Sequence, residues 1–390
     1  MGLHVTPEKA IRFTKITVAL AFTWPPSINS SNNRLLLFNV LWWAAFVSCL
    51  GLLLPLLSAI YVYSNEPVLL GKTVSLFSAV AQVMIKMIVC RLMQKRCYYH
   101  VVRLESDVRS FQRLFFDMEN FCKYATEEDR IVVQRHMDSY KYSHVVYAIW
   151  CFLTCLFVVS GPLYSPQMFP TLAIYPFPVE YQPMKSIIFF HQILVGCQAT
   201  AGMAIDAQIA LLLRYATVRF EILAIQLRKA KSGQDLNACI REHVKLLWYT
   251  KSVYKSVRFI ALATVATTHI AVIFGSLNLV TKQPLLFKLL FALVVFSASV
   301  ELIMYAWPAD SLIHASNKTA AAAYETNWFE ENVDIQRKIR FIILRSHRLE
   351  AIEISGIMPK ITLSYYASFL YTAMTCFTAL RIIVEKSNHD

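Results

Sequence analysis

Seven long apolar segments recur along the chain, separated by polar connections. They cover about 37–62, 68–90, 144–164, 186–212, 258–280, 285–306 and 363–384. A helix needs about 20 mostly apolar residues to cross the hydrocarbon core of a bilayer. The pattern therefore predicts an all-α membrane protein with seven transmembrane helices. The fourth segment, which holds Asp206, and the seventh, which is rich in Ser and Thr, fit least well.

Basic residues gather in alternate connections. Of the 38 Lys and Arg residues, 31 lie before the first span or in the connections that follow spans two, four and six. Lys and Arg accumulate in cytoplasmic loops. This bias predicts a cytoplasmic N-terminus and an extracellular C-terminus. A G-protein-coupled receptor would have the reverse orientation, and its Asp-Arg-Tyr and Asn-Pro-x-x-Tyr motifs are missing from spans three and seven, so that class is disfavoured.

The composition supports a membrane protein, with 56% hydrophobic residues, 16% charged residues and a mean hydropathy of +0.46. The net charge of +13 is then a property of cytoplasmic loops, and nucleic acid is not an expected partner. The nine cysteines show no metal-ligand spacing, and none lies in a predicted extracellular segment. We find no nucleophile–base set, phosphate loop or inverted repeat, so an enzyme or a transporter is disfavoured, and no metal or cofactor is expected.

The connections themselves contain helical patterns. Segments 98–141 and 213–257 carry apolar residues at helical spacing among charges, which predicts that spans two to five continue into the cytoplasm. Segment 309–358 has the pattern of two helices, whose apolar side chains either pack within one subunit or join subunits beneath the membrane. The outer connection 161–186 is rich in Pro and aromatic residues and forms either a lid over a pocket or an inert cap, of which the cap is slightly favoured. These patterns divide the chain into a cytoplasmic segment 1–36, a six-span bundle 37–306, cytoplasmic anchor helices 307–362, and a last span with a short extracellular tail 363–390.

The C-terminal third carries short motifs in a distinctive order. They are Tyr305–Asp310 (YAWPAD), Ser316, Ala323-Tyr324, Trp328, Arg345-Ser346, Leu363-Ser364, Phe369 and Thr375–Arg381 (TCFTALR). Together they resemble the insect odorant receptor family, whose last span carries a similar Ser-Tyr-Phe-Thr-Leu-Leu-Arg pattern, with Cys376 here in place of Tyr and Ala379 in place of Leu. Trp24-Pro25-Pro26 and Asp206 also fit that family. The motifs cover about 80 residues, and the likeness in length and topology covers the whole chain.

The resemblance implies a ligand-tuned subunit, because the co-receptor of that family is longer, with a larger second cytoplasmic loop. Such subunits form tetramers with the co-receptor in the plasma membrane. They bind a small volatile organic ligand and open a non-selective cation channel without G proteins. The alternative is a related gustatory-type ligand-gated channel, but the Thr-Tyr and Gln-Phe pairs usual in its last span are missing here.

Small and hydroxyl-bearing residues recur on one face of the last span. They are Ser364, Ser368, Thr372, Thr375 and Ala379, at helical spacings of four, four, three and four. Such a stripe is typical either of close helix packing or of a water-filled pore, and the resemblance favours the pore. A constriction is then expected at its outer end, near Phe377, Thr378, Ala379 and Leu380.

A volatile ligand needs an apolar cavity with few polar groups. By resemblance, this cavity is expected in the outer halves of spans two to six. The candidate residues are Phe77, Val80, Thr154, Phe157, Val158, His191, Gln192, Val195, His269, Ile273, Phe274, Phe291 and Val294. Ordinary helix packing is the alternative for each aromatic residue and Val. The polar residues His191, Gln192 and His269 are the stronger candidates, since polar groups at membrane depth are costly and are usually functional.

Two charged residues lie near the inner ends of spans two and six. Lys86 and Glu301 could form an ion pair across the bundle. The simpler prediction is that Lys86 extends its ammonium group to the lipid headgroups.

Overall fold

The fold was analysed in a computed structural model, which describes residues 6–26, 30–99, 111–164, 167–281, 284–349 and 351–387. Parts of the predicted segments 1–36, 98–141, 161–186 and 363–390 therefore lie outside the described residues. Within the described ranges the chain is almost entirely helical and forms no strand, only one antiparallel bridge between Ile354 and Met358.

The seven predicted spans fall on seven long helices. These are α2 (Asn32–Val62), α3 (Pro67–Tyr99), α5 (Glu127–Val159), α7 (Met184–Lys229), α8 (Gly233–Val280), α9 (Leu285–Tyr324) and α11 (Leu363–Ser387). The first six are long and apolar enough to cross a membrane. The seventh, α11, has 25 residues. Its Ser and Thr residues lower its mean hydropathy. The predicted all-α, seven-helix architecture is confirmed.

Helices α7 and α8 are much longer than one membrane crossing requires, as predicted. They contain 46 and 48 residues, which at 1.5 Å per residue makes each roughly 70 Å long, against about 30 Å of hydrocarbon. The turn between them ends at a capping box, in which Ser232 Oγ accepts from the Asp235 N–H (3.2 Å) and Asp235 accepts from the Ser232 N–H (3.1 Å). These bonds satisfy N–H groups that the first turn of α8 leaves unpaired.

The two helices predicted in segment 309–358 are the end of α9 and α10 (Val333–His347). The predicted boundary at residue 307 lies inside α9, which continues through Pro308. The third span is shorter than predicted, because α5 ends at Val159 and is followed by the short α6 (Gly161–Tyr164). Pro162 has no N–H to donate to a carbonyl one turn earlier, so it does not extend the helix.

The remaining helices are short and lie beside the bundle. They are α1 (Pro7–Thr17), η1 (Ala19–Ala21), α4 (Phe111–Tyr124) and η2 (Trp328–Glu330). Helix α1 is amphipathic, with Ile11 and Thr14 buried, and it packs against α4, α5 and α7. This contact joins the N-terminal segment to the bundle.

Helix α7 forms the centre of the fold. It packs against α5, α8 and α9, and almost every residue between Thr200 and Leu213 is buried. Helices α2 and α5, by contrast, expose apolar side chains such as Leu54 and Leu156, which are 55% and 65% exposed. Outward apolar faces of this kind suit lipid tails.

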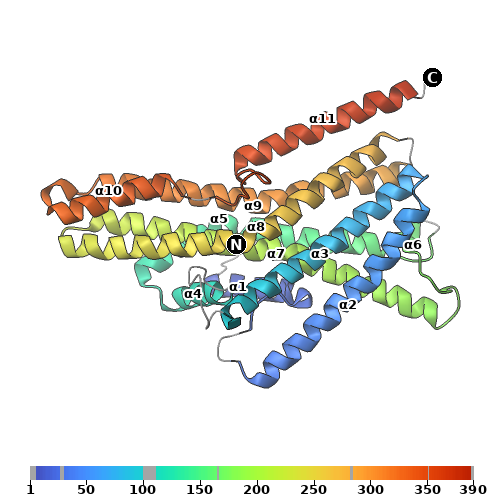
Figure 1. Cartoon of the computed structure of the whole chain (residues 1–390), viewed down its shortest axis with the longest axis horizontal. Coiled ribbons are helices and arrows are strands. Elements are labelled where there is room, and N and C mark those ends of the chain that lie inside the picture. Colours follow the sequence, from blue (N-terminus) through green and yellow to red (C-terminus); the bar gives the residue numbers. More distant parts are fainter. Residues whose placement is uncertain are drawn as a thin grey trace, which may run out of the picture.

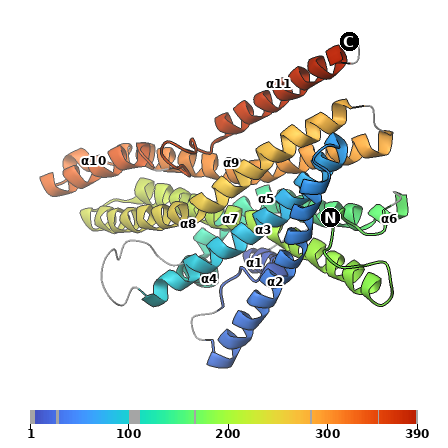
Figure 2. The ribbon, with the colours of Figure 1, turned by 45° about the vertical axis from the view of Figure 1, so that its right-hand side comes forward.

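The two ends of the bundle differ (Figure 1). The α7–α8 turn and α10 lie at one end, whereas the α2–α3 and α8–α9 connections lie at the other. Helix α11 stands away from the rest of the bundle, and Figure 2 shows the same separation from a second direction. Its bundle-facing side, which includes the buried Phe369, packs on α8 and α9.

Candidate functional site: an apolar cavity above a buried ion network

A cavity of about 220 Å³ lies among the helices at the end of the bundle that holds the α2–α3 and α8–α9 connections. Its walls come mainly from α3, α5, α7 and α9. Eight of the thirteen predicted ligand-site residues line it: Val80, Thr154, Phe157, Val158, Gln192, Val195, Phe291 and Val294. The structure therefore brings together residues from four spans that are distant in sequence.

The other five predicted residues lie outside the cavity lining. His191 Nε2 is 3.1 Å from the Ser48 carbonyl, and His269 Nδ1 is 2.7 Å from the Val265 carbonyl, so both imidazoles have backbone partners. Phe77 packs against an apolar cluster between α2 and α3. Phe274 is half-buried, and Ile273 is 49% exposed.

The connection between α6 and α7 closes one side of the cavity. Its residues Gln167, Pro170 and Thr171 belong to the lining. Gln192, which is 2% exposed, accepts from the Thr171 N–H (3.0 Å) and donates to the Tyr175 hydroxyl (3.2 Å). One buried amide thus fastens this segment over the cavity.

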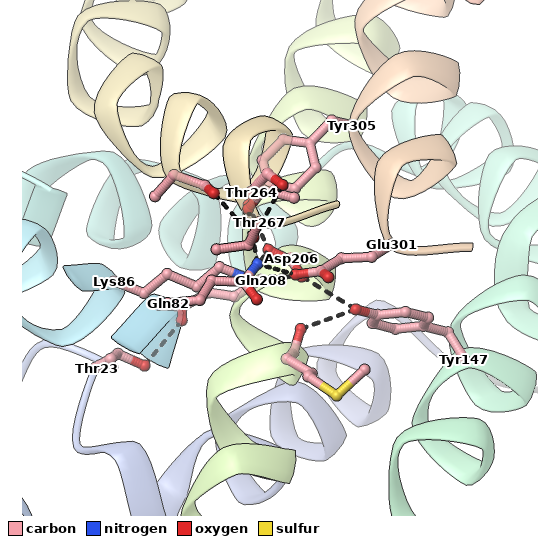
Figure 3. A network of polar contacts seen from close by, with 12 residues as sticks. Thr23, Gln82, Lys86, Tyr147, Asp206, Gln208, Thr264, Thr267, Glu301 and Tyr305 are labelled. Atoms are coloured by element: carbon pink, nitrogen blue, oxygen red, sulfur yellow. Dashed lines mark hydrogen bonds and ion pairs between the residues drawn. The ribbon is translucent and has the colours of Figure 1, made fainter. Parts of the chain in front are cut away.

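An ion network adjoins the cavity, because Gln82 and Glu301 belong to both, and Figure 3 shows the network. The Lys86 ammonium group donates to both Asp206 carboxylate oxygens, at 2.8 and 2.9 Å, and to Glu301 Oε1 at 2.7 Å. Lys86 and Asp206 are fully buried, and Glu301 is 5% exposed. The predicted pairing of Lys86 with Glu301 is confirmed. The prediction that Lys86 reaches the headgroups is wrong, because two carboxylates on α7 and α9 hold its ammonium group inside the bundle.

Neighbouring polar groups complete the network. The Tyr147 hydroxyl donates to Asp206 Oδ2 at 3.0 Å, and Tyr305 also donates to this carboxylate. Gln82 donates to Glu301, and both residues line the cavity. With one cation and two carboxylates, the network carries a formal charge of −1, which hydrogen bonds from Tyr and Gln partly offset. Glu301 therefore links the cavity to the charged centre of the bundle.

The sequence contains a signal for this network. Lys86, Asp206 and Glu301 are ionisable residues inside three different apolar segments. Such residues are costly in a membrane and usually pair with one another. The segments alone, however, do not show that α3, α7 and α9 meet at one depth.

The predicted pore residues occupy one face of α11. Ser364, Ser368, Thr372, Thr375 and Ala379 are all exposed, on a face centred about 100° around the helix axis from the buried Phe369. Of the predicted constriction, Thr378 is exposed with Ala379, whereas Phe377 and Leu380 are half-buried.

These features define a multi-pass helical membrane protein with a largely apolar cavity among its spans. A sequence model described as "7tm Odorant receptor" matches residues 66–374. The chain belongs to this family, as its motifs indicated.

Two curated relatives are odorant receptors of insects. Odorant receptor 30a of Drosophila melanogaster is 25% identical over 252 residues, which is 58% of this chain and 63% of the relative. Odorant receptor 10 of Aedes albopictus is 24% identical over 179 residues, or 43% of this chain and 47% of the relative. The chain thus spans less than two-thirds of the length of each.

Solved structures show the same fold. The olfactory receptor OR5 of Machilis hrabei in complex with eugenol matches with a TM-score of 0.79 and 14% identity, covering 96% of this chain and 98% of that one. The same receptor without a stated ligand matches with a TM-score of 0.78, also at 14% identity, covering 96% and 97% of the two chains.

Proposed function

We propose that this chain is the ligand-tuned subunit of an odorant-gated, non-selective cation channel in the plasma membrane. A small volatile organic ligand binds in the 220 Å³ cavity. The cavity is the observation that carries this proposal, because half of its lining residues are Val, Leu, Phe or Ala. Its polar lining residues are mainly Ser, Thr and Gln, together with Lys72 and Glu301. Apolar walls hold a volatile molecule, and polar groups orient it.

A continuous set of contacts links the cavity to α11. Phe291 and Val294 of α9 line the cavity, and α9 packs on α11. On the neighbouring α8, the His269 ring meets the Phe369 ring of α11 edge-on, with centroids 5.2 Å apart. A ligand that pushes α8 and α9 apart would therefore move α11. His269 would thus transmit movement from α8 to α11 without contacting the ligand itself.

The exposed face of α11 supports a conduction path. The hydroxyls of Ser368, Thr372 and Thr375 donate to carbonyls one turn earlier, at 3.1, 2.9 and 3.0 Å. Their oxygen lone pairs remain available to water or to a passing cation. Four such stripes around a central axis would form a weakly polar pore without an acidic ring, which fits low ion selectivity.

An exposed apolar patch supports assembly with partner subunits. Val244 and Trp248 on α8, with Phe341 and Leu344 on α10, are 38%, 40%, 51% and 61% exposed. This patch lies at the end of the molecule where the basic cytoplasmic segments are predicted. We infer that it joins co-receptor subunits in a tetramer, since large apolar patches on a soluble surface mark interfaces.

Filling the cavity is expected to reduce odorant-evoked current. Val294→Trp places a bulky ring in the cavity, and the expected result is at least a tenfold loss of agonist potency, about 1.4 kcal/mol. Ile273→Trp is the matched control, because Ile273 faces outward and should keep its potency. The measurement is whole-cell current over a broad odorant panel, with and without co-receptor, in cells whose G-protein signalling is blocked. Loss of every current under that block, in the unmodified receptor, would contradict the channel proposal.

Charging the exposed patch is expected to separate the subunits. In the double variant Phe341→Asp with Leu344→Asp, two carboxylates would be buried at the interface, which is unfavourable without partners. Size-exclusion chromatography should show mostly single subunits instead of tetramers, whereas the exposed polar change Lys338→Gln should leave the tetramer intact. Tetramers of unchanged stability in the double variant would place the interface elsewhere.

A further inference from the structure

A second, larger cavity lies apart from the odorant cavity. Its volume is about 440 Å³, and it is enclosed by α1, α4, α5 and α7. Apolar side chains such as Ile11, Phe13, Met118 and Val133 form most of its walls. None of the lining residues that the structure describes is acidic, whereas Lys9, Lys141 and Arg214 contribute cationic groups. Pockets of this size hold small organic ligands.

Arg214 is the residue that indicates which ligand the cavity takes. It is only 4% exposed, and its guanidinium group stacks against the rings of Tyr140 (3.6 Å) and Trp307 (4.8 Å). Its Nε and Nη2 atoms are buried and have no hydrogen-bond partner within the described part of the chain. A buried donor without an acceptor is costly, and a planar guanidinium is suited to phosphate or carboxylate oxygens.

A second buried polar atom belongs to the lining of the same cavity. His144 lines the cavity, and its Nε2 atom is buried without a hydrogen-bond partner among the described residues. The nearby charges are already paired, since Lys141 contacts Asp138 at 2.8 Å and Glu221 pairs with His136. Among the described residues, no carboxylate pairs with Arg214.

The depth of the cavity in the membrane favours a lipid as its ligand. Arg214 follows the predicted inner end of span four at residue 212, and His144 begins span three. With the predicted orientation, both lie at the cytoplasmic headgroup level, where anionic phospholipids gather. The apolar walls formed by α1 and α4 would then lie beside an acyl chain.

We propose that this cavity binds an anionic amphiphile, with its phosphate or carboxylate group on Arg214 and His144 and its apolar chain against α1, α4 and α5. A cytoplasmic-leaflet phospholipid is the expected source, and a free fatty acid shares the same chemistry. The bound molecule would fasten the N-terminal helix α1 to the bundle, because α1 supplies one wall of the cavity.

Native mass spectrometry of the purified full-length receptor tests this proposal. The probes are dioleoyl phosphatidic acid, oleate, inorganic phosphate, and dioleoyl phosphatidylcholine as the zwitterionic control. Phosphatidic acid should bind the unmodified receptor at least about tenfold more tightly than the Arg214→Gln variant, since a charge-assisted bond is lost. Arg228→Gln removes the same charge from an exposed pair outside the cavity and should bind normally.

A second variant keeps the charge of Arg214 but fills the cavity. Ala10→Trp fills the cavity from α1 and should also abolish binding, which keeps the test valid if Arg214→Gln does not fold. Binding of oleate in place of phosphatidic acid would support the proposal and identify a fatty acid as the source. Equal phosphatidic acid binding by the unmodified receptor and by folded Arg214→Gln or Ala10→Trp would overturn it. So would binding of inorganic phosphate as tight as that of phosphatidic acid.

Discussion

Replacing Lys86 with methionine is expected to destabilise the folded receptor by about 3–5 kcal/mol, since removing one partner of a buried ion pair leaves an uncompensated charge. Here the loss is severe because Asp206 and Glu301 would face each other without the ammonium group that contacts both, at 2.8 and 2.7 Å. Methionine keeps a similar length and shape, so the effect comes from charge rather than from a cavity. The measurement is thermal unfolding of purified protein, together with the amount of receptor at the cell surface.

Two comparisons separate charge from packing. In the triple variant Lys86→Met, Asp206→Asn, Glu301→Gln, no net charge remains in the network, and most of the lost stability should return. Lys72→Met removes a cation from the same helix, where Lys72 Nζ contacts Gln167 Oε1 at 2.8 Å at the cavity edge, and should cost far less. An unfolding temperature of Lys86→Met equal to that of the unmodified receptor would show that the three charges do not depend on one another.

Much of the fold was predictable because a bilayer imposes length and polarity on each crossing. The fourth span was among the weakest predictions, since it contains Asp206. Its polar groups are nevertheless satisfied inside the bundle, where Asp206 meets Lys86, Tyr147 and Tyr305. An apolar segment tolerates one carboxylate when other helices supply its hydrogen-bond and charge partners. The sequence of that segment alone does not identify these partners.

Side-chain direction was harder to predict than helix position. His191 and Gln192 are neighbours on α7, about 100° apart around a helix with 3.6 residues per turn. Gln192 faces the cavity and holds the segment above it, whereas His191 turns toward the Ser48 carbonyl on α2. Polarity alone favoured both residues equally. The choice between them depends on the rotation of α7, which the packing of α2, α3 and α5 determines.

The two cavities also differ in how far the sequence predicts them. The cavity that we propose for the odorant was expected from the family resemblance, and eight of the thirteen candidate residues line it. The cavity beside Arg214 was not predicted, since it depends on the docking of α1 and α4, two short amphipathic helices outside the spans. Hydrophobic periodicity detects such helices but does not show which surface they cover.

Attaching a positive charge along the exposed face of α11 is expected to reduce cation current at least fivefold. The design introduces single cysteines as Ser368→Cys, Thr372→Cys and Thr375→Cys into a Cys376→Ser parent, followed by a trimethylammonium thiol reagent. All three positions are exposed and share one face. A fixed positive charge about 4 Å from a passing cation repels it by about 1 kcal/mol even in water, and by more at lower dielectric. The measurement is odorant-evoked current before and after the reagent.

The control lies on the same helix. Met374→Cys is equally accessible, since Met374 is 64% exposed, but it points well away from the stripe around the helix axis. If α11 lines the pore with its Ser and Thr face, the reagent changes current at the three stripe positions and spares Met374→Cys. Equal inhibition at all four positions would point to a general disturbance of α11. Inhibition at Met374→Cys alone would place the ion path along a different face of the helix.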